Sequence, residues 1–162
     1  MRDITLLHPK VQELAKKLVD ECAKKGLLIK ITETMRTKEE QNALYAKGRT
    51  APGNIVTKVQ YPSSNHNWGI AFDFCRNDGT GAYEIKGNFF QKVGEIGKSL
   101  GLSWGGDFKS FKDMPHFEYT KFGNWRELQA KYKTPENFTK TFSNVHKIKV
   151  KNIKTTERQS QK

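Results

Sequence analysis

A strand that places one aspartate between two phenylalanines constrains this chain more than any other feature of its sequence. Phe72, Asp73 and Phe74 follow one another, and successive side chains of a strand point to opposite faces of a sheet. The two phenylalanines would therefore face a core, and Asp73 would face away from it. His66 comes shortly before, and Gly69 permits a sharp turn into the strand. One imidazole and one carboxylate can thus converge beside the sheet.

A second short strand carries another histidine. Pro115 keeps the preceding residue extended and the segment out of a helix. In the strand that follows, His116 and Glu118 would share one face, opposite Phe117. Asp113 lies on the loop before this strand and can approach His116.

His66, Asp73 and His116 make a sensible set of zinc ligands. Three protein ligands leave a fourth position for water, as in catalytic zinc sites. Zinc lowers the pKa of such a water, and the unligated carboxylate of Asp113 is the natural base to take its proton. Spacing alone leaves open that the histidines are ordinary core residues, since the chain has no HExxH motif. The same donor set also accepts other divalent ions.

Arg36 precedes a helix that begins with a capping box formed by Thr37 and Glu40. A cation at this place would stabilise an oxyanion or hold a substrate carboxylate. The alternative is a solvated arginine at the end of a strand.

The rest of the pattern predicts helices and short strands in one domain. Apolar residues three and four apart predict helices over 9–25, 38–47, 88–100 and 124–131. Alternation predicts short strands over 27–35, 70–75, 102–104 and 116–119. The stretch 49–64 lacks periodicity and is long enough to be a functional loop. Apolar surroundings favour a core position for four further residues, Cys22, Trp68, Cys75 and Trp104.

The net charge, the cysteine count and the lack of long apolar stretches limit the kinds of protein that this chain can be. The chain has 29 Lys and Arg against 17 Asp and Glu, a net charge of +12, which favours nucleic acid, an anionic membrane or an anionic wall polymer as partner. Two distant cysteines exclude a disulfide scaffold and a four-cysteine zinc site. No stretch reaches the ~18 apolar residues of a membrane span, and no secretory signal is visible.

The character of the chain changes near its C-terminus. We expect a domain over residues 1–132 and a basic tail over 133–162, which holds 8 basic and 2 acidic residues. The tail is expected to be a partly disordered basic arm, or a remnant of a wall-binding module. Val145, Ile148, Val150 and Ile153 would suit one strand within it.

The first histidine segment matches a known signature. Ser64-x-His66-x-x-Gly69-x-Ala71-x-Asp73 has the SxHxxGxAxD pattern of the zinc D-Ala-D-Ala carboxypeptidase and L-alanyl-D-glutamate endopeptidase family. The chain therefore resembles this family of peptidases.

Three further blocks extend the resemblance from about Leu6 to Tyr119, in the family's order and spacing. They are Asp113-x-x-His116, the segment Thr34-Met35-Arg36-Thr37 with Gln41 and Leu44 after it, and Trp104-Gly105-Gly106-Asp107-Phe108. Many relatives have a tryptophan where Phe108 stands. The short chain and the last block look most like the branch of phage endolysins.

The resemblance implies roles for individual residues. His66, Asp73 and His116 match the zinc ligands of the family. Asp113 matches its catalytic carboxylate, and Arg36 matches the residue that polarises or positions the scissile carbonyl.

Weaker correspondences concern substrate contact. Ser64 matches the serine of the signature and is expected beside the ligands or the substrate. Gln41 and Asp107 match positions near the site and are expected to bind substrate.

The resemblance implies a small α+β fold of the Hedgehog and DD-peptidase type, with an antiparallel sheet that carries a zinc site and helices packed on it. It also implies a peptidoglycan hydrolase that cleaves the L-alanyl-D-glutamate bond of the stem peptide. The alternatives are a D,D-carboxypeptidase that removes terminal D-alanine, or a non-catalytic basic protein that binds wall polymer or nucleic acid.

Expectations about partners and location follow. The partner would be bacterial peptidoglycan, and the protein a monomer without stable membrane insertion. Specific nucleic-acid binding is not expected, because aromatic residues do not interleave with the basic ones. An endolysin without a signal peptide would accumulate in the cytoplasm and reach the cell wall through a holin lesion at lysis.

Overall fold

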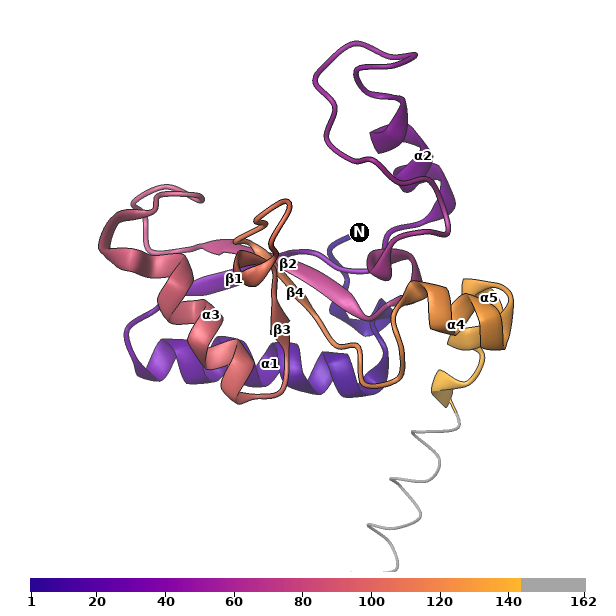
Figure 1. Cartoon of the computed structure of the whole chain (residues 1–162). Coiled ribbons are helices and arrows are strands. Elements are labelled where there is room, and N and C mark those ends of the chain that lie inside the picture. Colours follow the sequence, from indigo (N-terminus) through magenta and orange to yellow (C-terminus); the bar gives the residue numbers. More distant parts are fainter. Residues whose placement is uncertain (144–162) are drawn as a thin grey trace, which may run out of the picture.

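A small antiparallel sheet forms the centre of the protein (Figure 1). The structure, a computed structural model, describes residues 1–143. Within them, four strands are arranged in the order β1-β2-β4-β3. Their bounds are β1 Ile29–Glu33, β2 Ala71–Arg76, β3 Ser103–Trp104 and β4 His116–Glu118. The predicted α+β class is confirmed, and each strand lies inside or within one residue of its predicted range.

Two helices, α1 (Pro9–Lys24) and α3 (Phe89–Ser99), pack on one face of this sheet. Phe72, Phe74 and Phe117 point into the core between sheet and helices and are fully buried. The alternation predicted around Asp73 is therefore confirmed. Because one face of the sheet is filled by these rings, the intervening polar side chains lie on the other face.

The register of the strands places polar residues opposite one another. Asp73 of β2 pairs with His116 of β4, and on its other side it pairs with Glu33 of β1. Side chains directly opposite in an antiparallel pair lie close together on the same face. Residues more than 40 positions apart in the chain thus meet through the pairing of β2 with β4.

An arm, here residues 38–63, projects from the body of the protein (Figure 1). It consists of α2 (Lys38–Ala46) and the long loop after it, as the sequence predicts. The capping box of Thr37 and Glu40 is confirmed, with both of its hydrogen bonds formed. The arm therefore starts at a well-defined point next to Arg36.

A second, smaller core lies at the C-terminal end of the described chain. There α4 (Trp125–Tyr132) is followed by α5 (Pro135–Thr139), a short helix that the sequence analysis did not predict. Phe138 of α5 is buried against Trp68 and Leu128. The segment expected to begin the tail at residue 133 thus starts with residues packed on the domain. The strand suggested around Val145 lies outside the described residues.

The described residues also contain four 3-10 helices, η1 Ile4–Leu6, η2 Asn65–Trp68, η3 Lys86–Asn88 and η4 Gly105–Asp107. The tryptophans and cysteines expected in the core are all buried. Among residues 1–143, no helix has the length and apolar character needed to cross a membrane.

Close packing between α3 and β4 gives a stability prediction. A Cβ at Gly97 would overlap the ring of Phe117, the neighbour of His116. Gly97→Ala should therefore destabilise the fold by about 2 kcal/mol through overpacking, although Gly→Ala in an open helix stabilises by about 1 kcal/mol. Chemical denaturation monitored by circular dichroism measures the change.

Gln91→Ala, at an exposed position of the same helix, serves as the control and should leave stability within about 0.5 kcal/mol of the unsubstituted protein. A Gly97→Ala variant as stable as this control would show that Phe117 does not pack as described.

Candidate metal centre and catalytic cavity

His66 is placed by a single turn of 3-10 helix before β2. Ser64 caps this turn, and its hydroxyl accepts a hydrogen bond from the His66 backbone N–H at 3.3 Å. Gly69 ends the turn in the left-handed conformation, with φ +68°. That conformation favours glycine and turns the chain into β2, as the sequence predicts.

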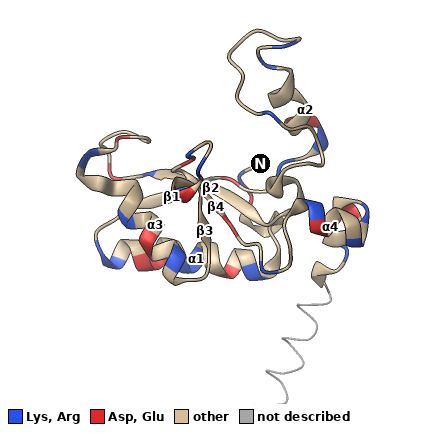
Figure 2. Ribbon diagram, in the orientation of Figure 1, with Lys and Arg blue, Asp and Glu red and all other residues tan. Residues whose placement is uncertain are grey.

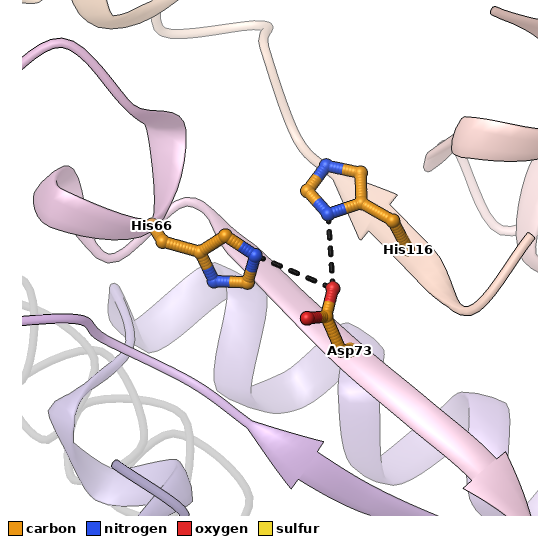
Figure 3. Close-up of side chains that lie close together, drawn as sticks. All are labelled: His66, Asp73 and His116. Atoms are coloured by element: carbon orange, nitrogen blue, oxygen red, sulfur yellow. Dashed lines mark hydrogen bonds and ion pairs between the residues drawn. The ribbon is translucent and has the colours of Figure 1, made fainter. Parts of the chain in front are cut away.

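Asp73 lies between two imidazoles (Figure 3). Its Oδ1 is 3.0 Å from Nδ1 of His116 and 3.3 Å from Nε2 of His66. Both histidines are nearly buried, with 4% and 7% of the surface of His66 and His116 exposed. The three residues predicted as zinc ligands are brought together.

This cluster fits a divalent metal ion. Each of the three residues offers one ligand atom, and these atoms all lie within 4.8 Å of one another. Two imidazole nitrogens and one carboxylate oxygen are a donor set that zinc prefers in catalytic sites. No other group of this kind is found among the residues that the structure describes.

The second nitrogen of each imidazole also has a partner. Nδ1 of His66 lies 2.9 Å from the carbonyl oxygen of Thr34, and Nε2 of His116 lies 3.1 Å from Oε2 of Glu118. Asn65 donates a hydrogen bond from Nδ2 to the same carboxylate at 2.7 Å. Such partners fix the orientation of a metal-binding imidazole and leave the other nitrogen free for the ion.

Glu118 was assigned no role from the sequence, although its place two residues after His116 was the available signal. Alternate residues of a strand share a face, and the structure uses this spacing for the hydrogen bond. Thr34 and Asn65 carried no such signal, because their contacts join segments that are distant in the chain.

The pKa values of Asp73 and His116 depend on the contacts between these two side chains. Burial alone would raise the pKa of Asp73, but hydrogen bonds from His116 and His66 outweigh it and hold the pKa well below its usual range. Burial opposes the charged form of His116, yet its bonds with Asp73 and Glu118 raise its pKa to about 9. Without a metal, the imidazole of His116 is therefore protonated at neutral pH.

Asp113 is held by the glycine-rich block before it. Its backbone N–H donates to the carbonyl of Gly105 at 2.9 Å, and a Cβ at Gly105 would overlap the carbonyl of Asp113. Trp104 donates from its indole N–H to the carbonyl of Met114 at 2.8 Å. The Trp-Gly-Gly block thus fixes the loop that carries Asp113 towards His116.

The carboxyl of Asp113 faces the same cavity as the three clustered residues. Partial desolvation raises its pKa; the positive charge of His116 opposes this rise, and the negative charge of Asp73 adds to it. A carboxylate with a raised pKa is better suited to accept and return a proton near neutral pH.

Arg36 also lines this cavity. Its backbone N–H donates to the carbonyl of His66 at 3.0 Å, and its guanidinium donates to Oε1 of Gln41 at 3.1 Å. Its Nε is buried, with no hydrogen-bond partner among the described residues. The interpretation as a solvated strand end is therefore not supported.

The three residues expected to contact substrate are placed differently. Ser64 lines the cavity. Gln41 is fully buried and holds Arg36, while its Nε2 donates to the carbonyl of Val59 at 2.7 Å. Asp107 does not line the cavity and pairs with Lys98 at 3.0 Å.

The cavity itself has a volume of about 660 Å³. Leu44 and residues 55–59 of the arm line it, together with Phe108 and Phe111 from the loop before β4. A volume of this order suits a short peptide or a drug-sized ligand.

Among residues 1–143, basic residues are distributed over the helices and the arm rather than gathered in one stripe (Figure 2). This part of the chain does not show the single basic face that marks many nucleic-acid-binding domains.

Comparisons with known proteins agree with these observations. A family model described as D-alanyl-D-alanine carboxypeptidase matches residues 57–119. This range includes all three clustered residues and Asp113.

Two curated relatives are similar in sequence. Peptidoglycan L-alanyl-D-glutamate endopeptidase CwlK of Bacillus subtilis (strain 168) is 45% identical over 121 residues, which cover 69% of this chain and 72% of the relative. L-alanyl-D-glutamate peptidase of Listeria phage A118 is 32% identical over 145 residues, which cover 86% of this chain. The match spans only 47% of the phage protein.

A solved structure shares the fold. It is a mutant of the vancomycin-resistance D,D-pentapeptidase VanY, from a VanB-type resistance cassette, in complex with Zn(II). The TM-score is 0.55 at 14% identity, and the match covers 82% of this chain and 83% of the other.

Metal uptake should release a proton. Because the raised pKa of about 9 keeps His116 protonated at pH 7 without metal, an ion that binds its imidazole must displace that proton. Zinc affinity should then rise about tenfold per pH unit from pH 7 towards 9. Titration calorimetry in buffers of different ionisation enthalpy counts the protons released. Release of none at pH 7 would contradict the protonated state.

Glu118 should strengthen metal binding through His116. Glu118→Gln keeps a hydrogen-bond acceptor but removes the charge, and it should weaken zinc binding about tenfold. Competition with a chromophoric chelator measures the affinity. Glu95→Gln, on the exposed side of α3, is the control and should leave the affinity unchanged. Equal affinities of the two variants would rule out the role of Glu118.

Proposed function

Because the chain belongs to the family of D-alanyl-D-alanine carboxypeptidases and L-alanyl-D-glutamate endopeptidases, we propose that it is a metallopeptidase that hydrolyses bacterial peptidoglycan. The resemblance found in the sequence is thereby confirmed. The observation that carries the proposal is the convergence of His66, Asp73 and His116 on one point, with Asp113 and Arg36 in the same cavity.

The bond cleaved is the one between L-alanine and D-glutamate in the stem peptide. Both curated relatives are named for this bond, one from a bacterium and one from a phage. The proposed enzyme acts on the cell wall. Accumulation in the cytoplasm and release through a holin lesion, a monomeric state, and the division into domain 1–132 and tail 133–162 stay predictions.

Zinc would be held by His66, Asp73 and His116, and when bound it supplies the chemistry of a Lewis acid, which activates water and polarises a carbonyl group. The partners of the outer imidazole nitrogens, Thr34 and Glu118, keep both rings aimed at the ion.

Asp113 is the general base and acid of the reaction. Its carboxylate accepts the proton of the attacking water and then passes it to the amine of the leaving D-glutamate. The raised pKa supports both transfers, since the group binds a proton more readily than a solvated aspartate does.

Arg36 stabilises the negative charge that develops on the scissile carbonyl oxygen. Gln41 positions the guanidinium of Arg36 through a hydrogen bond. It does not touch the substrate, because its side chain is fully buried. Ser64 lies where it can meet the substrate, and its cap also holds His66. Asp107, bound to Lys98, is better explained as a structural residue of the loop.

A second candidate is a D,D-carboxypeptidase, which the description of the matching family model favours. The same residues would cleave the bond before a terminal D-alanine. A non-catalytic basic binding protein is less well supported, because it would need neither the clustered ligands nor Asp113.

Analysis of the fragments released from purified peptidoglycan tests the proposal. Mass spectrometry should find new D-glutamate N-termini, and a chelator should abolish their release. Asp113→Asn should lower turnover by at least about 100-fold while it retains zinc. Release of D-alanine instead would favour the carboxypeptidase, and no chelator-sensitive release would contradict both enzymes. Loss of zinc from Asp113→Asn would make Asp113 a ligand.

A further inference from the structure

The cavity carries a lysine that the proposed chemistry does not use. Lys58 lies on the arm and lines the cavity that holds the clustered ligands. Its Nζ is 3.9 Å from the centroid of the Phe111 ring, which lines the same cavity. The cation is therefore held against the cavity lining by the face of an aromatic ring.

The backbone on both sides of Lys58 is anchored. Arg49 donates a hydrogen bond to the carbonyl of Thr57 at 3.1 Å, and Gln41 donates to the carbonyl of Val59 at 2.7 Å. Gln41 also holds the guanidinium of Arg36. One buried amide thus connects the guanidinium of Arg36 to the backbone of the segment that carries Lys58.

Neither cation has a carboxylate partner in the described part of the chain. No ion pair is found for Lys58 or Arg36, whereas the carboxylate of Asp73 is taken by two imidazoles. Lys58 is exposed, and its apolar neighbours on the cavity lining, Phe111, Ile55 and Val56, have 66%, 58% and 57% of their surface exposed. The cation is therefore accessible to a substrate, and two cations that line one cavity attract an anion more strongly than a single surface cation does.

A glutamate residue within a peptide supplies such an anion. It has two carboxyl groups, and continuation of the chain uses one of them. When the chain continues through the γ-carboxyl, the α-carboxyl stays free and sits on the carbon that bears the scissile nitrogen; when it continues through the α-carboxyl, the free group lies at the end of the side chain. Arg36 is committed to the carbonyl oxygen on the other side of the bond, so the free carboxylate requires another cation.

We propose that Lys58 and Phe111 form a subsite for the free carboxylate of the glutamate residue that follows the scissile bond. This inference rests on the proposed function and names the group by which the enzyme selects its substrate. Lys58 is a specificity-determining residue: it makes the cavity prefer a substrate with an anion at this place over one with a neutral amide.

Two peptides that differ in one group test the subsite. Both contain the L-alanyl-D-glutamate bond, and the free carboxyl of the glutamate is a carboxylate in one and a carboxamide in the other. The full chain loaded with zinc should cleave the carboxylate peptide with about tenfold higher kcat/KM, as expected for one charge-assisted hydrogen bond. The preference should shrink as the salt concentration rises.

Substitutions assign the preference to Lys58. Lys58→Met should cleave both peptides with equal kcat/KM, because it keeps the apolar stem and loses the charge, whereas Lys58→Arg should retain the preference. Lys109→Met is the matched control: it removes one charge from an exposed position two residues before Phe111 that does not line the cavity. This variant should retain the preference.

The possible results distinguish a failure of the proposed subsite from a failure of the proposed function. A wild-type protein that cleaves both peptides equally, or a Lys58→Met variant that keeps the tenfold preference, would overturn the subsite and leave the proposed function standing. A wild-type protein that cleaves the bond after L-alanine in neither peptide would refute the proposed function, and the subsite with it. Loss of the preference in Lys58→Met alone supports the subsite.

Discussion

The shared carboxylate of Asp73 is the interaction on which the rest of the site depends. It sits opposite His116 in the pairing of β2 with β4 and also reaches His66 from the preceding turn. An unpaired carboxylate in so enclosed a place would be costly, and two imidazoles offset that cost. The same contacts raise the pKa of His116 and favour a proton on its imidazole, which a metal ion at the proposed site would have to displace.

The other face of the sheet supplies the rigidity that this arrangement requires. Phe72 and Phe117 alternate with the ligands and are locked between the sheet and two helices. Gly97 allows α3 to approach Phe117 closely. Because a ligand and a core residue are neighbours on one strand, tight packing on one side fixes the geometry on the other.

The arm is connected to the site through a buried side chain at its base. Gln41, buried at its base, bonds with Arg36 on one side and with the carbonyl of Val59 on the other. A residue that resembles a substrate ligand in the sequence thus acts as a connector in the structure. It connects the guanidinium of Arg36 to the segment that carries Lys58, so the residues proposed for reaction and for recognition share one buried support.

The sequence by itself determined the four strands, the helices α1 to α4 and the chemical types at the site, but not the short helix α5. Alternation around Asp73 and the proline before His116 sufficed to predict two strands, each with a ligand on its polar face, because these signals are local. Only the tertiary structure decided which polar groups meet. Thr34 behind His66, Asp107 turned to Lys98, and Lys58 over Phe111 all depend on contacts between segments that are distant in the chain. Such contacts are set by packing and strand register, which no local pattern encodes.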